Sequence, residues 1–229
     1  GGAMCPSYRA TKDEKDTTRA RANTLREFLT NSKRSNKFNH QELKEVFDLC
    51  LSCKACASEC PSNVDVAALK SEFLYQYQEE NGYSFRNSMF ANNVKYNKIG
   101  SLFPSLTNLV LNTYVTKSIM GISLKRSVPK LTPKTLKSWY KKQTHSSSKK
   151  IIYVFCDEFT NFYDTEIGKD TIAVLKRLGY NPTLINHPES GRSFISKGFL
   201  KEAKAIANKN VSLFKDFISE KTPLVGIEP

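Results

Sequence analysis

The chain has 229 residues, enough for one large or two small domains with proper cores. Its 39% hydrophobic and 11% aromatic content predicts a folded, soluble protein. The net charge of +13 suggests an acidic partner, a nucleic acid or an anionic membrane surface. The Lys and Arg residues are spread along the chain without a zinc-finger, RNP or homeodomain pattern, which disfavours nucleic acid.

The two ends of the chain suggest a piece of a longer protein. The chain begins GGAMCPSY, without an initiator methionine, and it ends in the apolar, strand-like run PLVGIEP. No stretch resembles a signal peptide or a transmembrane span. Four of the six cysteines lie close together, so a metal site in a reducing compartment is favoured over disulfides. We expect a cytoplasmic protein, either free or held peripherally on the inner face of the membrane.

The first 142 residues are predicted to contain helices and loops without strands. Helices are expected at 11–30, 41–49, 64–80, 84–97 and 102–119. Thr11 and Glu14 have capping-box spacing for the first of these helices. Asn63 and Asp65 are alternative caps for the third helix.

The sequence pattern changes after a polar, Ser-rich stretch, KKQTHSSSKK at 141–150, in which we place a linker at 143–149. Trp139 and Tyr140, just before it, are expected to pack on the helical part. Beyond it the pattern predicts, in order, a strand at 151–155, a helix at 164–179 that ends at Gly179, a strand at 183–186, a helix at 193–219 and a strand at 223–227.

Alternating strands and helices predict a parallel sheet of three strands. The expected fold class is therefore α+β with more than one domain. An all-α domain of residues 1–142 precedes a partial α/β parallel-sheet domain of residues 150–229.

Four cysteines, Cys50, Cys53, Cys56 and Cys60, follow the spacing C-x2-C-x2-C-x3-C-P. Bacterial ferredoxins use this run, in which three thiolates at two-residue gaps face one cubane cluster. Soft thiolates suit iron and sulfide. Zinc is the rival, but structural zinc usually uses two separated C-x2-C pairs or Cys/His pairs. The run therefore predicts a 4Fe–4S cluster, and with it an all-α ferredoxin-type 4Fe–4S domain over residues 1–142.

The fourth ligand of this cluster is open between two cysteines. Cys5 also precedes a proline, which repeats the ending of a ferredoxin run. In the crossed arrangement of two-cluster ferredoxins, Cys5 completes the cluster held by the first three cysteines of the run, and Cys60 binds a second cluster. In the alternative arrangement, Cys60 closes its own cluster and Cys5 is free. Because two Cys-Pro pairs imply two motifs, we favour the crossed arrangement.

A resemblance to the C-terminal iron–sulfur part of large FAD-linked oxidases is carried by two stretches, GGAMCPSYRATKDEKDTTRARANTLREFL and DLCLSCKACASECPSNVDVAALKSEFLYQY. These oxidases are the D-lactate, glycolate and D-2-hydroxyglutarate dehydrogenase-like proteins. The later stretches FCDEFTNFYDTEIGKDTIAVLKRLGY, SGRSFISKGFLKEAKAIANKNV and PLVGIEP resemble the cysteine-rich domain shared with heterodisulfide reductases and glycerol-3-phosphate dehydrogenase subunits. Residues 85–140 match more loosely.

The resemblance implies an N-terminal flavin domain of the same protein that holds FAD and oxidises a 2-hydroxy acid. One or two 4Fe–4S clusters then pass single electrons to a quinone or another carrier, and residues 1–229 alone do not turn over. A second hypothesis is a non-redox interaction module, in which a structural cluster or a zinc ion staples a small helical domain.

One departure from the family concerns the α/β domain. Relatives have two adjacent cysteines before a Gly-Arg pair, where this chain has Glu189 and Ser190. Cys156 is the single cysteine of this domain. We expect it to be a buried small hydrophobe rather than a metal ligand.

Three arginines of the first predicted helix have two interpretations. They either face the clusters and raise their potential, or they form a solvated helix face, and the three are Arg19, Arg21 and Arg26.

Overall fold

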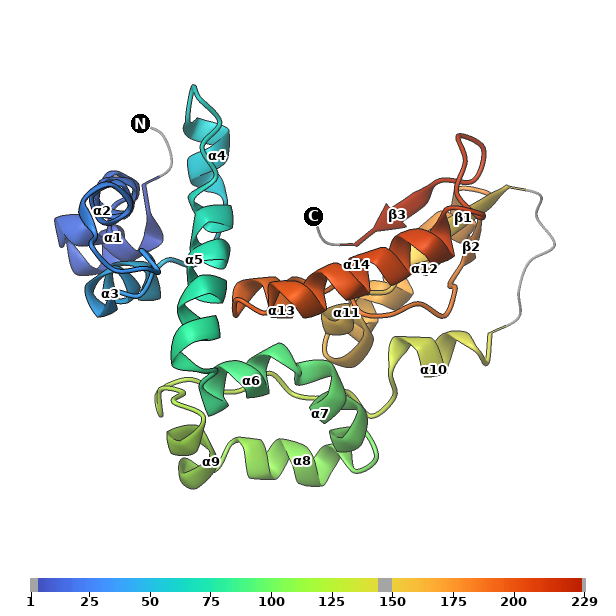
Figure 1. Ribbon diagram of the computed structural model, residues 1–229. Coiled ribbons are helices and arrows are strands. Elements are labelled where there is room, and N and C mark those ends of the chain that lie inside the picture. The colour runs from blue at the N-terminus through green and yellow to red at the C-terminus, as the bar shows by residue number, and fades with distance from the viewer. Residues whose placement is uncertain (1–3, 144–149, 228–229) are drawn as a thin grey trace. The chain divides into compact units, whose positions relative to one another are not determined.

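The computed structural model describes residues 4–143 and 150–227 (Figure 1). These residues group into two compact units. The first unit takes Ala91 and the residues before it together with Arg192–Lys201, and the second takes Asn92–Gly191 and the residues from Glu202 onward. This grouping follows contacts rather than chain order, so the predicted domains of 1–142 and 150–229 stay a prediction. The predicted linker lies, apart from residue 143, outside the described residues.

Helices make up the regular structure of the first unit among the residues described. Its elements are α1 (Pro6–Thr11), the 3-10 turn η1 (Glu14–Asp16), α2 (Thr18–Asn31), α3 (Gln41–Asp48), α4 (Ala55–Glu59), α5 (Val66–Asn81), α6 (Phe85–Ala91) and α13 (Arg192–Ser196). Leu25, Phe47 and Phe73, from α2, α3 and α5, lie in one buried core. The rings of Phe47 and Phe73 stack with their centroids 5.3 Å apart. This core fixes α3 and α5, which bracket the cysteine run.

Helix α2 begins at Thr18 and not at Thr11, so the capping-box prediction was wrong. Thr17 is the N-cap, and its side chain accepts a hydrogen bond from the N–H of Ala20. Thr11 is the last residue of α1, and its hydroxyl donates to Asp16 Oδ2 at 2.7 Å. The Thr11 hydroxyl is therefore engaged by a side chain of the following turn and does not start a helix.

Helix α5 begins directly after Asp65, one of the two caps that the sequence predicted. Asp65 Oδ1 accepts hydrogen bonds from the N–H groups of Ala67 and Ala68, at 2.9 and 3.0 Å. The two long helices expected after α5 are each split into two shorter ones. Between Asn81 and Thr135 the described helices are α6, α7 (Asn93–Gly100), α8 (Pro104–Leu111) and α9 (Tyr114–Ile119). Thr113 causes the second break, because its backbone is extended (φ −69°, ψ 153°) and its side chain caps α9.

The second unit combines α7, α8 and α9 with a small sheet. Its further elements are α10 (Leu136–Tyr140), β1 (Ile151–Phe155), α11 (Glu158–Phe162), α12 (Thr165–Arg177), β2 (Asn181–Thr183), β3 (Leu224–Gly226) and α14 (Leu200–Phe214), whose first two residues group with the first unit. The strand order is β2-β1-β3, and both pairings are parallel, so the predicted parallel three-stranded sheet is confirmed. Tyr153 of the central strand pairs with Thr183 on one side and Leu224 on the other.

Helix α12 ends where the sequence predicts. Gly179 adopts φ +84°, and the N–H of Tyr180 donates to the carbonyl of Leu175 at 3.0 Å, which closes the helix end. Strand β2 follows at 181–183, earlier than the predicted 183–186. It contains Pro182, which an edge strand tolerates because its outer N–H groups need no partner strand.

Two further expectations for this part of the chain were wrong. The helix predicted at 193–219 is two helices, because Gly198 at φ +74° separates α13 from α14. Trp139 and Tyr140 pack against Cys156 and Ile172 of the α/β part rather than on the helical part. The Tyr140 hydroxyl also donates to the carbonyl of Pro182 at 2.8 Å.

No helix among residues 4–143 and 150–227 is both long enough and apolar enough to cross a bilayer.

Candidate functional site

The cysteine run leaves the end of α3, passes through a tight loop and enters α4. The N–H of Cys50 bonds to the carbonyl of Phe47 at 3.0 Å, which ties the first cysteine to the last turn of α3. Ser52 and Lys54 then adopt left-handed backbone conformations, with φ of 54° and 60°. Non-glycine residues in this conformation are strained and are frequent at functional sites. Cys56 lies in α4 and packs against the core of the first unit.

A cavity in the first unit is lined by four thiols. They are those of Cys50, Cys53 and Cys56 from the run, and of Cys5 from the segment before α1. The cavity is partly open to solvent. Cys60 is not among the lining residues, although it is close in sequence. The cavity wall thus contains the four thiols of the crossed arrangement.

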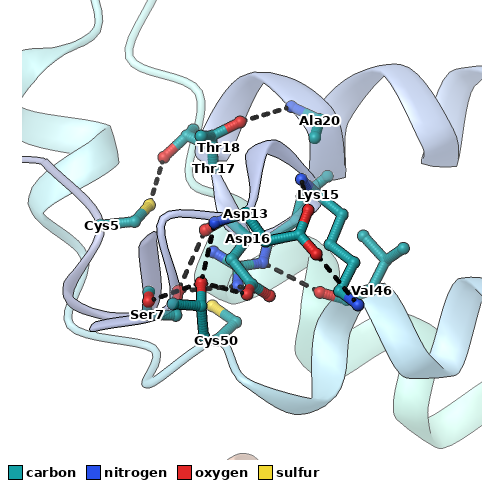
Figure 2. Close-up of polar contacts among 12 residues, drawn as sticks. Cys5, Ser7, Asp13, Lys15, Asp16, Thr17, Thr18, Ala20, Val46 and Cys50 are labelled. Carbon is teal, nitrogen blue, oxygen red and sulfur yellow. Dashed lines mark hydrogen bonds and ion pairs between the residues drawn. The ribbon is translucent and has the colours of Figure 1, made fainter. Parts of the chain in front are cut away.

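Cys5 reaches the cavity from the N-terminus of a short helix. It directly precedes α1, and Pro6 occupies the first helical position, where a missing N–H costs no hydrogen bond. The sulfur of Cys5 lies 2.9 Å from the hydroxyl of Thr18, the first residue of α2 (Figure 2). The Cys-Pro pair therefore sets a thiol between the starts of two helices.

Arg21 is a buried cation in the wall of the same cavity. Its Nε donates to the carbonyl of Val46 at 3.1 Å, and its Nη2 donates to the hydroxyl of Ser7 at 2.9 Å. Nη2 also lies 3.7 Å from Oδ1 of Asp16. These partners, labelled in Figure 2, join α1, η1 and α3 to α2.

The three arginines of α2 differ in their environments. Arg19 is exposed and pairs with Glu14, with Nη2 and Oε1 2.6 Å apart. Arg26 is exposed as well. Arg21 is the one of the three that borders the cavity.

Lys70 is a second buried cation beside the cysteine run. Its ammonium group donates to the carbonyl of Cys50 at 2.5 Å. Burial lowers the pKa of Lys70, and the nearby Cys50 thiol opposes this shift. With Arg21, it provides positive charge close to the thiols.

Cys60 has a different environment from the four cavity thiols. It ends α4, and its own N–H bonds to the carbonyl of Cys56 at 3.1 Å. Backbone N–H groups of Val64, Ser62 and Asn63 hydrogen-bond its sulfur and lower the pKa of the Cys60 thiol. Such a thiolate is a suitable ligand for a soft metal, at a place outside the cavity lining.

The donor set of the cavity fits an iron–sulfur cubane better than a single ion. All six cysteines are free thiols, and the four in the cavity are soft ligands. Among residues 4–143 and 150–227, no group of three Cys, His, Asp or Glu side chains lies close enough to hold one metal ion. The thiolates of a cubane bind different irons around a larger body, so thiols spread over a cavity wall are compatible with it. Two buried cations also suit a group that carries negative charge.

Cys156 is buried in the second unit, as expected. It is 2% exposed, and burial raises the pKa of its thiol to about 12. Its N–H donates to Nε2 of His187 at 3.1 Å. Ser190 donates its hydroxyl to Glu158 Oε1 at 2.8 Å. These contacts are typical of a packed core, and none of them indicates that Cys156 or Ser190 is a metal ligand.

Sequence reasoning missed Lys70, and it placed Arg21 on a different helix face from Arg19 and Arg26 without recognising that this face is buried. Arg21 lies four residues before Leu25 and seven before Phe28, so helical spacing puts it on the buried face. Lys70 lies four residues after Val66 in the same way. A cation on the apolar stripe of a helix was the available signal.

Comparison with known proteins agrees with this chemistry. Residues 2–65 match the family described as a 4Fe-4S dicluster domain. Along 99% of its length, the chain is 26% identical to D-2-hydroxyglutarate dehydrogenase of Pantoea ananatis and 24% identical to that of Escherichia coli. Along 70% of its length, it is 24% identical to one of the subunits of anaerobic glycerol-3-phosphate dehydrogenase of Escherichia coli. No solved structure matches the chain.

The chain spans 27% of the length of the two D-2-hydroxyglutarate dehydrogenases and 42% of the glycerol-3-phosphate dehydrogenase polypeptide. These matches confirm the resemblance that the sequence stretches indicated and the prediction of an iron–sulfur cluster. They are consistent with an iron–sulfur module of an oxidoreductase.

Proposed function

We propose that this chain, which contains a 4Fe-4S dicluster domain, is the electron-transfer part of an FAD-linked dehydrogenase for a 2-hydroxy acid. A flavin domain of the same protein oxidises the acid and accepts two electrons. An iron–sulfur cluster accepts one electron at a time, so the clusters divide the pair and pass it to a quinone or another carrier. D-2-hydroxyglutarate is the first substrate to test, because the chain is similar to dehydrogenases of that name along 99% of its length.

The cavity with four thiols carries this proposal. We assign Cys5, Cys50, Cys53 and Cys56 as the ligands of one 4Fe–4S cluster, and Cys60 as a ligand of a second cluster. The cavity lining supports the first set, and the separate environment of Cys60, with a lowered thiol pKa, supports the second assignment. The cluster would supply one-electron chemistry when bound, and the residues that would hold it come from the start of α1 and from the loop that leads from α3 into α4.

The buried cations contribute to the same task. Arg21 and Lys70 lie beside the thiols and favour the reduced, more negative state of a bound cluster.

The test is anaerobic reconstitution of the 229-residue chain with iron and sulfide. Electron transfer predicts a brown protein that absorbs broadly near about 400 nm and bleaches with dithionite. A colourless protein that binds zinc instead would contradict it and favour the non-redox interaction module. A chain in which Cys50 and Cys53 are both replaced by serine is the matched control and should stay colourless.

The substrate part of the proposal needs the whole protein. With its flavin domain present, D-2-hydroxyglutarate or a related 2-hydroxy acid should reduce the clusters without dithionite. If the clusters respond to dithionite but to no 2-hydroxy acid, the electron-transfer role stands and the substrate class is wrong.

A further inference from the structure

Helix α8 turns its polar side toward the rest of the second unit. The Asn108 side chain makes two hydrogen bonds with the backbone of Leu131. Its Nδ2 donates to the Leu131 carbonyl at 2.9 Å, and its Oδ1 accepts from the Leu131 N–H at 2.8 Å. One turn later, Asn112 Oδ1 accepts from the N–H of Val128 at 3.1 Å. These bonds fix the rotation of α8 about its axis, so its opposite side must face outward.

The outward side of α8 is apolar. Leu106, Leu109 and Val110 have helical spacing and lie on it, and Leu102 and Phe103 precede them at matching positions. Leu102 is 71% exposed and Phe103 is 70% exposed. A surface helix of a globular protein normally has the reverse orientation, with its apolar side buried.

Helix α9 repeats this inverted orientation directly after α8, which it contacts (Figure 1). Its Lys117 is buried, while Tyr114, Val115 and Ile119 are exposed. Six side chains, each at least 60% exposed, form what we call the apolar face: Leu102, Phe103, Leu106, Leu109, Tyr114 and Val115. Exposed apolar surface of this extent marks an interaction site.

The stretch of sequence that contains the apolar face carries charged side chains of one sign. No Asp or Glu occurs between Glu80 and Asp157, although this stretch contains 13 Lys and Arg, as many as the net charge of the whole chain. Lys98, Lys125 and Arg126 are exposed and lie within a few residues of the apolar face or of Leu124, another exposed apolar side chain. The Lys and Arg residues are spread along the whole chain, whereas Asp and Glu are absent from residues 81–156. The net positive charge is therefore concentrated in this stretch.

We propose that α8 and α9 dock on the surface of an anionic lipid bilayer, with the apolar face among the headgroups and the surrounding Lys and Arg on anionic phosphates. Apolar and aromatic side chains on one side, cationic residues beside them and no acidic residue in the surrounding stretch of sequence are the properties of a helix that lies in the membrane interface. A protein partner would need the apolar face, but it would not need the absence of acidic residues over so long a stretch. This inference goes beyond the proposed electron transfer and does not depend on it.

The experiment is flotation of the 229-residue chain with lipid vesicles. Vesicles of phosphatidylcholine with about 30% phosphatidylglycerol should carry the chain upward, and pure phosphatidylcholine vesicles should bind it at least about tenfold less. Raising the salt to about 0.5 M should weaken binding, because it screens the cationic residues. The double variant Leu106→Asn/Leu109→Asn should bind anionic vesicles about tenfold less than the parent chain.

The matched control replaces two exposed apolar residues of α12, as Ile167→Asn/Val174→Asn, and should bind like the parent chain. Circular dichroism checks that all variants fold. Equal binding to both vesicle types, or full binding by the Leu106/Leu109 variant, overturns the proposal. A chain that binds neither vesicle type also overturns it. If that chain is a dimer in solution and the Leu106→Asn/Leu109→Asn variant is a monomer, the apolar face binds a second copy of the chain. Cluster content is measured separately, so these outcomes leave the electron-transfer proposal untouched.

Discussion

Arg21 and Asp16 form an ion pair inside the first unit, with Nη2 and Oδ1 3.7 Å apart and each side chain 1% exposed. Taking two charges out of water is costly, so such a pair is tolerated only with further hydrogen bonds. Arg21 donates to the Val46 carbonyl and to the Ser7 hydroxyl, and Asp16 Oδ2 accepts a hydrogen bond from the Thr11 hydroxyl. Because Ser7 and Thr11 belong to α1, the pair holds the helix that follows Cys5.

Replacing Arg21 should therefore damage both stability and cluster binding. We expect Arg21→Gln to lower the free energy of unfolding by about 3–5 kcal/mol, since it leaves the Asp16 carboxylate buried without its cation. Iron content after reconstitution should fall as well, because α1 is no longer held in place. Urea unfolding and iron analysis measure the two effects.

The matched control for this prediction is Arg19→Gln, on the same helix but exposed. It should change the free energy of unfolding by less than about 0.5 kcal/mol. Adding Asp16→Asn to Arg21→Gln should restore part of the loss, because the uncompensated charge is removed. Equal urea midpoints for Arg21→Gln and Arg19→Gln would sink this account of the pair.

Lys70 should tune the potential of a bound cluster. Lys70→Met removes a cation that contacts the Cys50 carbonyl, so the reduced cluster loses electrostatic stabilisation. We expect the midpoint potential to fall by roughly 50 mV, since interactions of about 1 kcal/mol correspond to shifts of this size for one electron. A redox titration followed by electron paramagnetic resonance measures it. Lys33→Met, at an exposed loop position, should leave the potential unchanged, and an identical shift in both variants would refute the role of Lys70.

His187 should make the second unit sensitive to acid. Its Nδ1–H donates to the carbonyl of Pro188 at 2.5 Å, and its Nε2 accepts from Cys156 N–H, which requires the neutral ring. Burial, and then the proximity of Lys137, lower the pKa of His187 to about 4. The unfolded chain takes up this proton near pH 6.5, so the stabilisation is complete above that pH and is lost as the pH falls toward about 4.

Urea unfolding of the parent chain and of His187→Gln between about pH 7 and 4.5 tests this prediction. Glutamine still accepts the Cys156 N–H, but it does not titrate. The stability advantage of the parent chain should shrink by up to about 3 kcal/mol on acidification. An advantage that is independent of pH would show that His187 is not held neutral.

The local parts of the fold were predictable from the sequence. Asp65 before an apolar-periodic run, Gly179 after one, and the IIYVF run each specify an element through neighbours a few residues away. The cysteine spacing indicated the cluster chemistry in the same way, and the repeated Cys-Pro pair indicated Cys5 as a candidate ligand.

The missed features depend on partners that are distant in sequence. Arg21 is buried because it meets the Val46 carbonyl, 25 residues away, and Tyr140 packs on the α/β part because it meets the Pro182 carbonyl, 42 residues away. Thr11 has the spacing of a helix cap, but its hydroxyl donates a hydrogen bond to the Asp16 carboxylate instead. The inverted orientation of α8 follows from the bonds between Asn108 and Leu131, which helical spacing alone does not show.

The most direct test of the cluster assignment compares Cys5→Ser, Cys60→Ser and, as a control thiol outside the cavity, Cys156→Ser. Iron and sulfide per chain are measured after anaerobic reconstitution of the 229-residue chain. The account predicts that Cys5→Ser loses most of the cluster, while Cys60→Ser and Cys156→Ser keep it. Loss of the cluster in Cys60→Ser together with its retention in Cys5→Ser would contradict the account and show that the run closes its own cluster.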